Sequence, residues 1–336
     1  MQDSIVHVAV AAIIDDQGRV LLARRPDHAH QGGLWEFPGG KLASGESVSA
    51  ALVRELREEL GIVPISQRPL LRIRHDYQDK SVLLDVWRVD AFTGMGDTIA
   101  VDGSHGVGRE GQALRWVVPQ ALPGINFPAA NRAIVNALRL PDRYLITPGP
   151  GEDQARYLQQ LELVLQRGIK LVRLRAWRLD GLAYQSLAGR VVALCHDYQA
   201  QCLLSCDNLE TAAAVIGATA ADGLHLSCRQ LMTLSQRPVV GQVWIAASCH
   251  HTVEVEQACS VGVDFITLSP VQVTRSHPHE QPMGWEHFRN LTERATMPVY
   301  ALGGLNEYDI EPCWQYGGQG VAAISSLWDR KSDHQR

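Results

Sequence analysis

Residues 40–62 read GKLASGESVSAALVRELREELGI, and no other stretch of this chain says as much about its fold. The stretch fits the pattern G-x5-E-x7-R-E-U-x-E-E-x-G-U, where U is an aliphatic residue, at every fixed position. The matching residues are Gly40, Glu46, Arg54, Glu55, Leu56, Glu58, Glu59, Gly61 and Ile62. Because so many positions agree in spacing, a chance match is improbable. The pattern predicts a glycine loop that leads into a helix carrying several carboxylates.

The predicted helix places carboxylates beside its buried side. Its apolar stripe, spaced at the helical period, consists of Val48, Leu52, Leu56 and Leu60. Glu59 falls inside this stripe, Glu55 lies beside it and Glu58 further round, while Arg54 and Arg57 point the other way. One interpretation is a solvated charged face, as in most glutamate-rich helices. Carboxylates crowded on the buried side would repel one another, which favours a bound cation. Ligand sets made of oxygen alone indicate a hard ion, Mg2+ or Mn2+.

Length and charge narrow the class of protein. At 336 residues the chain is long for one domain, so two are expected. A net charge of −5 gives no electrostatic footprint for duplex nucleic acid, and we expect no direct binding to it. The longest apolar runs are too short to span a bilayer. The start, MQDSIVHVAVAAIIDD, lacks a basic region and a cleavage site, so no signal peptide and no membrane association are expected.

The cysteines indicate a reducing compartment. All 7 lie beyond residue 190, their number is odd, and no CxxC pair or zinc-like spacing occurs. We interpret them as buried free thiols, which predicts a cytoplasmic protein.

The chain changes its rhythm near residue 142. Before this point we expect strands at 8–14, 20–23, 83–89 and 113–118, the carboxylate helix, and a last helix at 129–140. The run from Leu140 to Arg143, LPDR, breaks the helical pattern, and a new strand follows at once. The predicted domains are residues 1–141 and 142–330, followed by a polar tail at 331–336.

The second half predicts a closed barrel. Eight β-rich runs are expected at 144–147, 171–175, 202–205, 223–226, 244–248, 264–268, 299–302 and 321–324. Helix-length segments separate most of them, which is typical of a (β/α)8 TIM barrel. Phosphate sites in such barrels often follow strands seven and eight. Gly303, Gly304 and Ser325 stand at those places, although glycines there also serve as plain turn residues.

The first half resembles the Nudix hydrolases, and within them the MutT-type branch that hydrolyses 8-oxo-dGTP. Besides the pattern at 40–62, the resemblance rests on LWEFPGGK at 34–41, ARR at 23–25, REGQ at 109–112 and FPAAN at 127–131. It implies an α/β/α sandwich and a Mg2+-dependent pyrophosphohydrolase. The implied catalytic residues are Glu55, Glu58, Glu59 and Glu110, which with Gly39 are also the implied metal ligands.

The resemblance also implies residues that bind the nucleotide substrate. Arg25 sits where the family places a purine-contacting arginine, and Asn131 where an asparagine reads the oxidised guanine edge. An amide suits that role because it offers a donor and an acceptor, although Asn also favours helix caps. Phe37 and Tyr77 are expected either to pack on the purine or to belong to the core.

The second half resembles thiamine phosphate synthases and their TenI-like relatives. The resemblance lies in short strand ends: LVRLR at 171–175, GLHL at 223–226, LSP at 268–270, ALGG at 301–304 and GVAAIS at 320–325. The family's Gln-x-Arg-x-Lys reads Arg173-Leu174-Arg175-Ala176-Trp177, and its Asn-Asp pair reads Cys206-Asp207. Its Gly-Gln-x-Asp segment reads SCRQ at 227–230, and its Thr-x-Thr-Lys run reads TRSH at 274–277.

These departures remove a lysine and a metal-linked carboxylate that charge compensation in a synthase requires. Arg175, Asp207, the glycine pair and Ser325 still form a candidate phosphate site for a thiamine-related ligand.

Three functional hypotheses remain. The first is a Mg2+-dependent 8-oxo-dGTP diphosphatase that cleans the nucleotide pool, prevents mutation and so serves DNA replication and repair. The barrel would then be a degenerate synthase acting as an accessory domain. The second is a bifunctional thiamine-pathway enzyme that hydrolyses thiamine diphosphate or damaged analogues. The third makes the barrel a binding module that senses a phosphorylated ligand or fixes the assembly of the protein.

Overall fold

The computed structural model of the chain describes residues 5–27, 31–77, 81–94, 105–176, 179, 181–238, 241–274 and 281–329. The chain divides into two compact units, Met1–Arg139 and Leu140–Arg336. The polar tail expected at 331–336 lies outside the described residues. No helix of the described segments is long and apolar enough to cross a bilayer.

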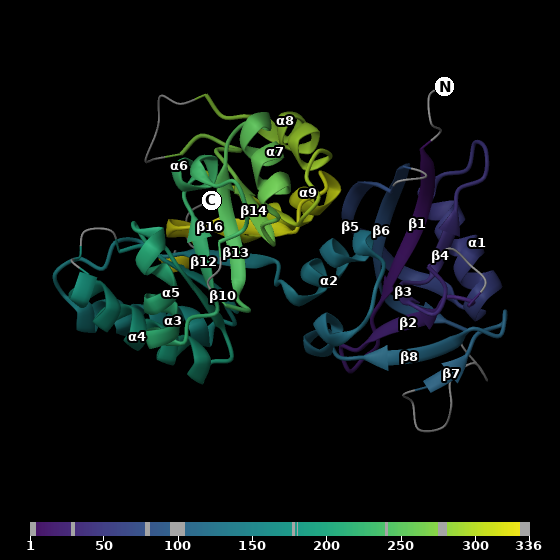
Figure 1. Cartoon of the computed structure of the whole chain (residues 1–336), viewed down its shortest axis with the longest axis horizontal. Helices are drawn as coiled ribbons and strands as arrows, with labels where there is room; N and C mark the ends of the chain where they lie inside the picture. The colour runs from purple at the N-terminus through teal and green to yellow at the C-terminus, as the bar shows by residue number, and fades with distance from the viewer. Residues whose placement is uncertain are drawn as a thin grey trace. The chain divides into compact units, whose positions relative to one another are not determined.

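The first unit is built on two four-stranded sheets (Figure 1). One sheet has the order β4-β1-β6-β5 and the other β3-β2-β8-β7. The strands are β1 (Val6–Ile13), β2 (Val20–Arg24), β3 (Trp35–Glu36), β4 (Gly39–Lys41), β5 (Val63–Asp76), β6 (Ser81–Thr93), β7 (His105–Val107) and β8 (Ala113–Val117). The helices are α1 (Val48–Leu60), the 3-10 turns η2 (Pro119–Gly124) and η3 (Ala129–Asn131), and α2 (Arg132–Arg139).

Strand β1 shows why this unit is a sandwich. Ala9, Ala11 and Ile13 belong to a core cluster with Leu52 and Leu56 of α1. The alternate residues of the strand, among them Val10 and Ala12, belong to a second cluster, which contains Ile134 and other residues of α2. Successive side chains of a strand point to opposite faces, so one apolar strand contributes to two cores. The expected α/β/α sandwich is confirmed.

The second unit is a closed barrel of eight parallel strands in the order β10-β11-β12-β13-β14-β15-β16-β9. The strands are β9 (Arg143–Ile146), β10 (Leu171–Leu174), β11 (Gln201–Leu204), β12 (Gly223–Leu226), β13 (Trp244–Cys249), β14 (Phe265–Leu268), β15 (Val299–Leu302) and β16 (Gly320–Ala323). The helices are α3 (Gln154–Gln166), α4 (Gly181–Asp197), α5 (Leu209–Thr219), α6 (Cys228–Thr233), α7 (Thr252–Val261), α8 (Gly284–Thr292), η4 (Glu307–Asp309), α9 (Ile310–Gln315) and α10 (Ser325–Trp328). The predicted TIM barrel is confirmed.

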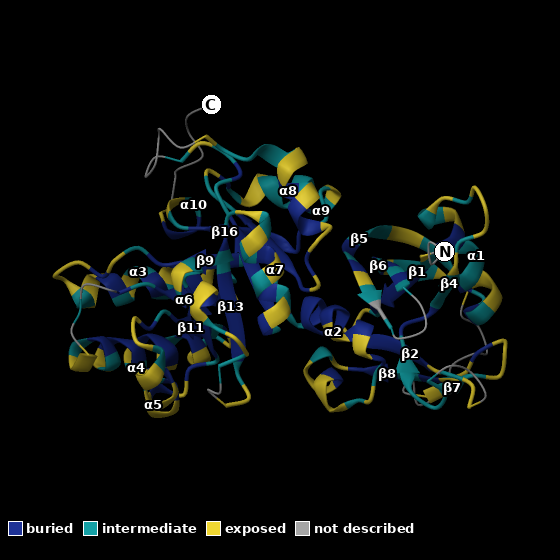
Figure 2. Cartoon of the chain, turned by 45° about the horizontal axis from the view of Figure 1, so that its top comes forward, coloured by how far each residue is buried: buried dark blue, intermediate teal, exposed yellow. Residues whose placement is uncertain are grey.

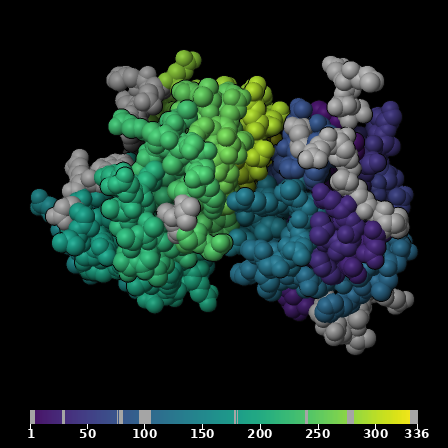
Figure 3. All heavy atoms as spheres, viewed as in Figure 1, coloured from purple at the N-terminus to yellow at the C-terminus, as the bar shows by residue number. Residues whose placement is uncertain are grey.

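Two apolar layers hold the barrel together. Large aromatic side chains fill its interior, among them Tyr144, Trp244, Phe265 and Tyr300. The outward-facing strand residues pack instead against the surrounding helices. The strands are therefore buried on both faces, whereas the helices expose their outer sides (Figure 2). All 7 cysteines are free thiols in this unit, which is coloured teal to yellow in Figure 3.

Candidate active site

Helix α1 carries the candidate catalytic carboxylates and packs against the sheet that contains β1. The Ser47 hydroxyl caps its first turn by accepting from the Ala50 amide at 3.2 Å. At the other end Gly61 takes a left-handed conformation with φ +71°, which favours glycine. Leu52, Leu56 and Leu60 are fully buried, so the helix is held against the sheet along its apolar stripe.

Glu59 lies at the centre of the carboxylate group. Burial, with repulsion from Glu55, Glu110 and Glu36, raises its pKa to about 8, although a hydrogen bond from the Gly39 amide at 3.2 Å acts in the opposite direction. Four carboxyl groups from α1, β3 and the segment before β8 therefore act on one another. Such a group favours a bound cation, which would relieve their mutual repulsion.

The glycine loop is shaped by close contacts with the strand and with these carboxylates. Gly39 has φ +143°, and a Cβ there would lie 2.1 Å from the Ala9 carbonyl oxygen. A Cβ on Gly40 would lie 2.1 Å from the Glu55 carboxyl carbon. Only residues without a side chain allow the loop to approach β1 and Glu55 in this way.

Arg54 ties the loop to the helix. Its guanidinium donates to both oxygens of Glu46, at 3.0 and 2.9 Å, and to the Lys41 carbonyl oxygen at 3.1 Å. It also donates to Glu55 at 2.7 Å and to Glu58 at 3.4 Å. The hydrogen bonds from Arg54 and from a backbone amide lower the pKa of Glu46 to about 2.

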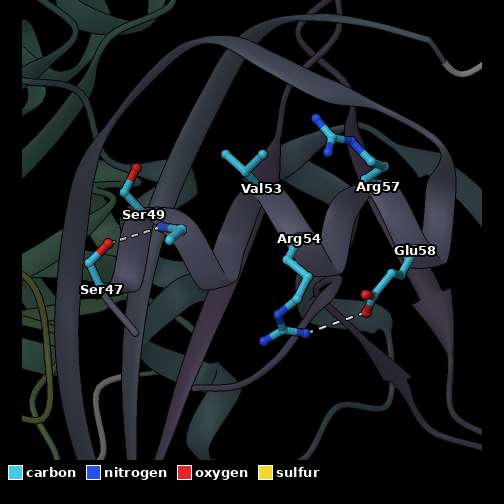
Figure 4. Close-up of a pocket in the computed structure, with 7 residues that line it drawn as sticks. Ser47, Ser49, Val53, Arg54, Arg57 and Glu58 are labelled. Atoms are coloured by element: carbon cyan, nitrogen blue, oxygen red, sulfur yellow. Dashed lines mark hydrogen bonds and ion pairs between the residues drawn. The ribbon is translucent and has the colours of Figure 1, made fainter. Parts of the chain in front are cut away.

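The expectation that Arg54 points away from the carboxylates is wrong. A helical wheel places the Cα atom, but the long arginine side chain reaches back over the neighbouring turn. Figure 4 shows Arg54 paired with Glu58 at a surface pocket. The pocket runs along the outer face of α1, and Ser47, Ser49, Ala50, Val53 and Arg57 complete its lining.

The segment before β8 docks on the end of α1. The Arg109 amide donates to the Glu59 carbonyl oxygen at 2.8 Å, and the Gln112 side chain donates to the same oxygen at 3.3 Å. The Arg109 guanidinium donates to the Arg57 carbonyl oxygen at 3.1 Å. The two bonds to Glu59 satisfy a carbonyl in the last turn of the helix, and the docked segment brings Glu110 into electrostatic contact with Glu59.

The residues expected to contact the nucleotide differ in their burial and in their contacts with other side chains. Arg25 forms an ion pair with Glu36, whose pKa is raised by burial against the attraction of Arg25. Phe37 is 4% exposed and stacks on Phe127, with ring centroids 5.4 Å apart. Tyr77 is half-buried and packs edge-on against a histidine ring.

Asn131 lies in η3, directly before α2, and is 8% exposed. The Asn131 backbone N–H donates to the Pro128 carbonyl oxygen at 2.9 Å, whereas its side-chain amide makes no hydrogen bond with another described residue. Such a side-chain amide can offer a donor and an acceptor to a ligand.

The carboxylates fit a hard metal ion by their donor chemistry. Every candidate ligand is an oxygen, from Glu55, Glu58, Glu59, Glu110 or the Gly39 carbonyl. Among the described residues no three His, Cys, Asp or Glu side chains converge on one point. The Arg54 guanidinium instead takes an oxygen of Glu55 and one of Glu58.

The candidate phosphate residues of the barrel all follow the carboxyl ends of strands. Arg175 follows β10, Asp207 lies beyond β11, Gly303 and Gly304 follow β15, and Ser325 opens α10 after β16. With β9 these strands are consecutive around the barrel. The glycines have φ +105° and +72°, and a Cβ on either would strike the segment after β14. Tight loop packing therefore accounts for both.

Three polar residues were not predicted as site residues. Arg173 and His225 are buried in the barrel strands β10 and β12. In the first unit, Glu36 of β3 lies near Glu59. A signal was present, because Arg173 and His225 interrupt otherwise apolar strands. An ionisable side chain in a buried strand needs a partner or a function.

Comparison with known proteins matches both units. Residues 9–137 match the NUDIX domain family, and residues 143–327 match the thiamine monophosphate synthase family. An 8-oxo-dGTP diphosphatase of Proteus vulgaris is 44% identical over 25% of this chain and 75% of its own length. A CTP pyrophosphohydrolase of Escherichia coli is 40% identical over 36% of this chain and 81% of its own length. A putative thiamine-phosphate synthase 2 of Aquifex aeolicus is 34% identical over 56% of this chain and 98% of its own length.

The carboxylate helix and the closed barrel agree with these matches, unit by unit. The chain is a fusion that belongs to two families, with a Nudix hydrolase domain followed by a domain of the thiamine monophosphate synthase family.

Proposed function

We propose that the first unit hydrolyses 8-oxo-dGTP and related purine nucleoside triphosphates to the monophosphate and pyrophosphate, with Mg2+ as cofactor. The observation that carries the proposal is the group of carboxyls around Glu59, which requires a cation for compensation. The relatives named for 8-oxo-dGTP and for CTP support a nucleoside triphosphate as the substrate class. The side-chain amide of Asn131, which bonds no other described residue, and the placement of Arg25 favour the oxidised purine.

The chemistry follows from the charge of the substrate. Mg2+ held by Glu55, Glu58, Glu59, Glu110 and the Gly39 carbonyl would neutralise the phosphates. A carboxylate takes a proton from water as that water attacks the β-phosphorus. The bond from the β-phosphorus to the oxygen shared with the α-phosphate breaks, so the nucleoside monophosphate is the leaving group and the water oxygen ends in pyrophosphate. Glu55 and Glu110 are both candidates for the base, and Arg54 with Glu46 braces the loop.

The test is pyrophosphate release from 8-oxo-dGTP, dGTP, CTP and thiamine diphosphate, measured side by side with Mg2+. Glu58→Gln removes one proposed ligand at an exposed position and should lower kcat by at least tenfold. Glu311→Gln, an exposed glutamate of the second unit, is the matched control and should leave the rate unchanged. Preference for CTP would remove the purine assignment of Arg25 and Asn131.

The alternative is a thiamine-pathway enzyme, favoured by the fusion to a domain like the Aquifex relative. Preference for thiamine diphosphate in the same assay would establish it.

For the barrel we propose a retained ligand site without synthase chemistry, because the family's lysine and one carboxylate are replaced. Thiamine phosphate should raise its melting temperature, while synthase turnover should be undetectable.

The proposed hydrolysis of oxidised nucleotides in the precursor pool would place the protein in the cytoplasm, without contact with DNA.

A further inference from the structure

The barrel interior changes from apolar to polar toward the carboxyl ends of its strands. The inner apolar layer of the barrel is followed, toward the carboxyl ends of five neighbouring strands, by a layer of polar side chains that also point inward. These side chains are Arg173, Ser205, His225, Ser248 and Thr267. The first four are joined by hydrogen bonds.

Arg173 is the centre of this polar layer. Its Nε donates to the Ser205 hydroxyl at 2.9 Å and its Nη1 donates to the Ser248 hydroxyl at 3.2 Å. The same Ser248 hydroxyl lies 3.0 Å from His225 Nε2, and His225 Nδ1 lies 2.8 Å from the Tyr144 hydroxyl. The guanidinium thus spans from β11 to β13, past β12.

The layer holds positive charge with no negative partner. Arg173 is 8% exposed and forms no ion pair with a carboxylate of the described residues. Burial lowers the pKa of Arg173 to about 10. Burial, helped by Arg173 and Arg175, also lowers the pKa of His225 well below its usual value, so the imidazole is neutral. A buried cation without a counter-charge is costly for a fold.

A second polar atom in the layer has no partner. Thr267 follows Phe265 on the inward side of β14, and its register partner on β13 is Ser248. Its hydroxyl is buried, with 0% exposure of the residue, and makes no hydrogen bond in the described structure. Buried hydroxyls are satisfied in nearly all folded proteins, so the position is prepared for a further acceptor or donor.

We propose that this polar layer binds an oxyanion, the carboxylate or phosphate group of a small molecule, which pairs with Arg173 and accepts from Thr267. The glutamine that the synthase family has at this place carries no charge. Arg173 therefore adds a positive charge that a glutamine at this place lacks.

The other end of the same barrel shows what an arginine with a structural role looks like here. Arg237 donates to the Asp264 carboxylate at 2.6 Å, at the amino end of β14, and also to the Gly262 carbonyl oxygen at 2.7 Å. That cation has its counter-charge within the protein. Arg173 has only neutral hydroxyls, which a neutral side chain would serve as well.

The experiment is amide hydrogen exchange with peptide resolution on the full-length chain, with sodium phosphate or sodium acetate as the probe at constant ionic strength. Peptide resolution separates the barrel from anion binding by the first unit. At a probe concentration about ten times the dissociation constant, amide exchange at the carboxyl ends of β10 and β13 should slow roughly tenfold. Protection by phosphate alone would identify a phosphate ester, and protection by acetate alone a carboxylate.

Arg173→Gln should abolish this protection. Arg237→Gln should lower the stability of the fold but retain the protection by the probe. Absence of protection by both probes in the wild-type chain, or equal protection of Arg173→Gln, would overturn the proposal. If Arg173→Gln does not fold, Thr267→Val decides. This isosteric variant should fold and bind the probe several-fold more weakly, and unchanged binding would count against the site.

Discussion

At the scale of single residues, Glu59 shows how surroundings select a ligand. Its carboxyl shares a half-buried space with Glu36, Glu55 and Glu110, and it accepts a hydrogen bond from the Gly39 amide. Arg54 pairs with Glu55 and Arg25 with Glu36, but none of the described cationic side chains pairs with Glu59 itself, so the repulsion on Glu59 remains. A divalent ion would therefore contribute stability as well as chemistry.

We predict that Mg2+ raises the melting temperature of the wild-type chain by a few degrees and that a chelator reverses the shift. Glu59→Gln should abolish the shift, because it removes the carboxylate at the centre of the group. The measurement is a thermal scan with Mg2+ or a chelator, with Glu311→Gln as the control that retains the shift. An undiminished shift in Glu59→Gln would place the ion elsewhere.

Two adjacent glycines should separate activity from stability. A Cβ on Gly40 meets the mobile end of Glu55, so Gly40→Ala should displace that carboxyl and reduce kcat while the unit stays folded. A Cβ on Gly39 meets the backbone of β1 at a φ that disfavours alanine, and Gly39→Ala should cost about 2 kcal/mol or more. Denaturant unfolding and initial rates of both variants check this. Equal loss of stability in both would contradict the contact argument.

At the scale of elements, the cap of α1 supports the whole carboxylate group. Ser47→Ala should cost about 1 kcal/mol and accelerate amide exchange in α1 roughly fivefold. Ser44→Ala is the matched control, because Ser44 lies in the same loop and is exposed. Unchanged amide exchange in α1 of Ser47→Ala would show that packing alone holds the helix.

The elements also show what the sequence could predict. All eight barrel strands were predicted within about a residue of their observed limits, because each is a short apolar run between turn residues. Strand β5 was missed altogether. Its pairing with β6 shifts register near Pro64, Ser66 and Pro69, so the alternation that marks a strand is interrupted.

The candidate site was predictable where chemistry depends on spacing along one helix. Glu55 and Glu59 could be placed beside the apolar stripe from their order alone, whereas Glu58, also expected on the buried side, is exposed. Arg173 stands out in the sequence as a charged residue in an apolar strand, but the sequence does not show its isolation from carboxylates, which depends on the strands that neighbour β10. The direction of Arg54 was wrong for a related reason, since a long side chain chooses its partners across the loop.

At the scale of the whole molecule, the buried His225 makes the barrel sensitive to acid. Its folded pKa lies below that of the unfolded chain, near 6.5, so the unfolded state binds more protons as the pH falls. Stability is present above about pH 6.5 and is lost below it, by up to about 1.4 kcal/mol per pH unit. Arg173, Tyr144 and Ser248 surround the ring and supply no negative charge to oppose the loss.

The check is amide exchange of peptides that cover β12, compared between wild type and His225→Gln at each pH. The comparison at one pH removes the intrinsic dependence of exchange on hydroxide. The difference between the two chains should grow as the pH is lowered from 7 to 5. Parallel behaviour of both would exclude His225 as the source.

The closure of the barrel by pairing of β16 with β9 has a consequence for synthesis in the cell. Strand β9 is the first element of the second unit to leave the ribosome, and its partner β16 is among the last. The first unit, complete by Arg139, can fold while most of the barrel is still untranslated. The nascent barrel must keep its apolar strands out of contact with other chains until β16 has been translated, so chaperone demand should fall on the second unit.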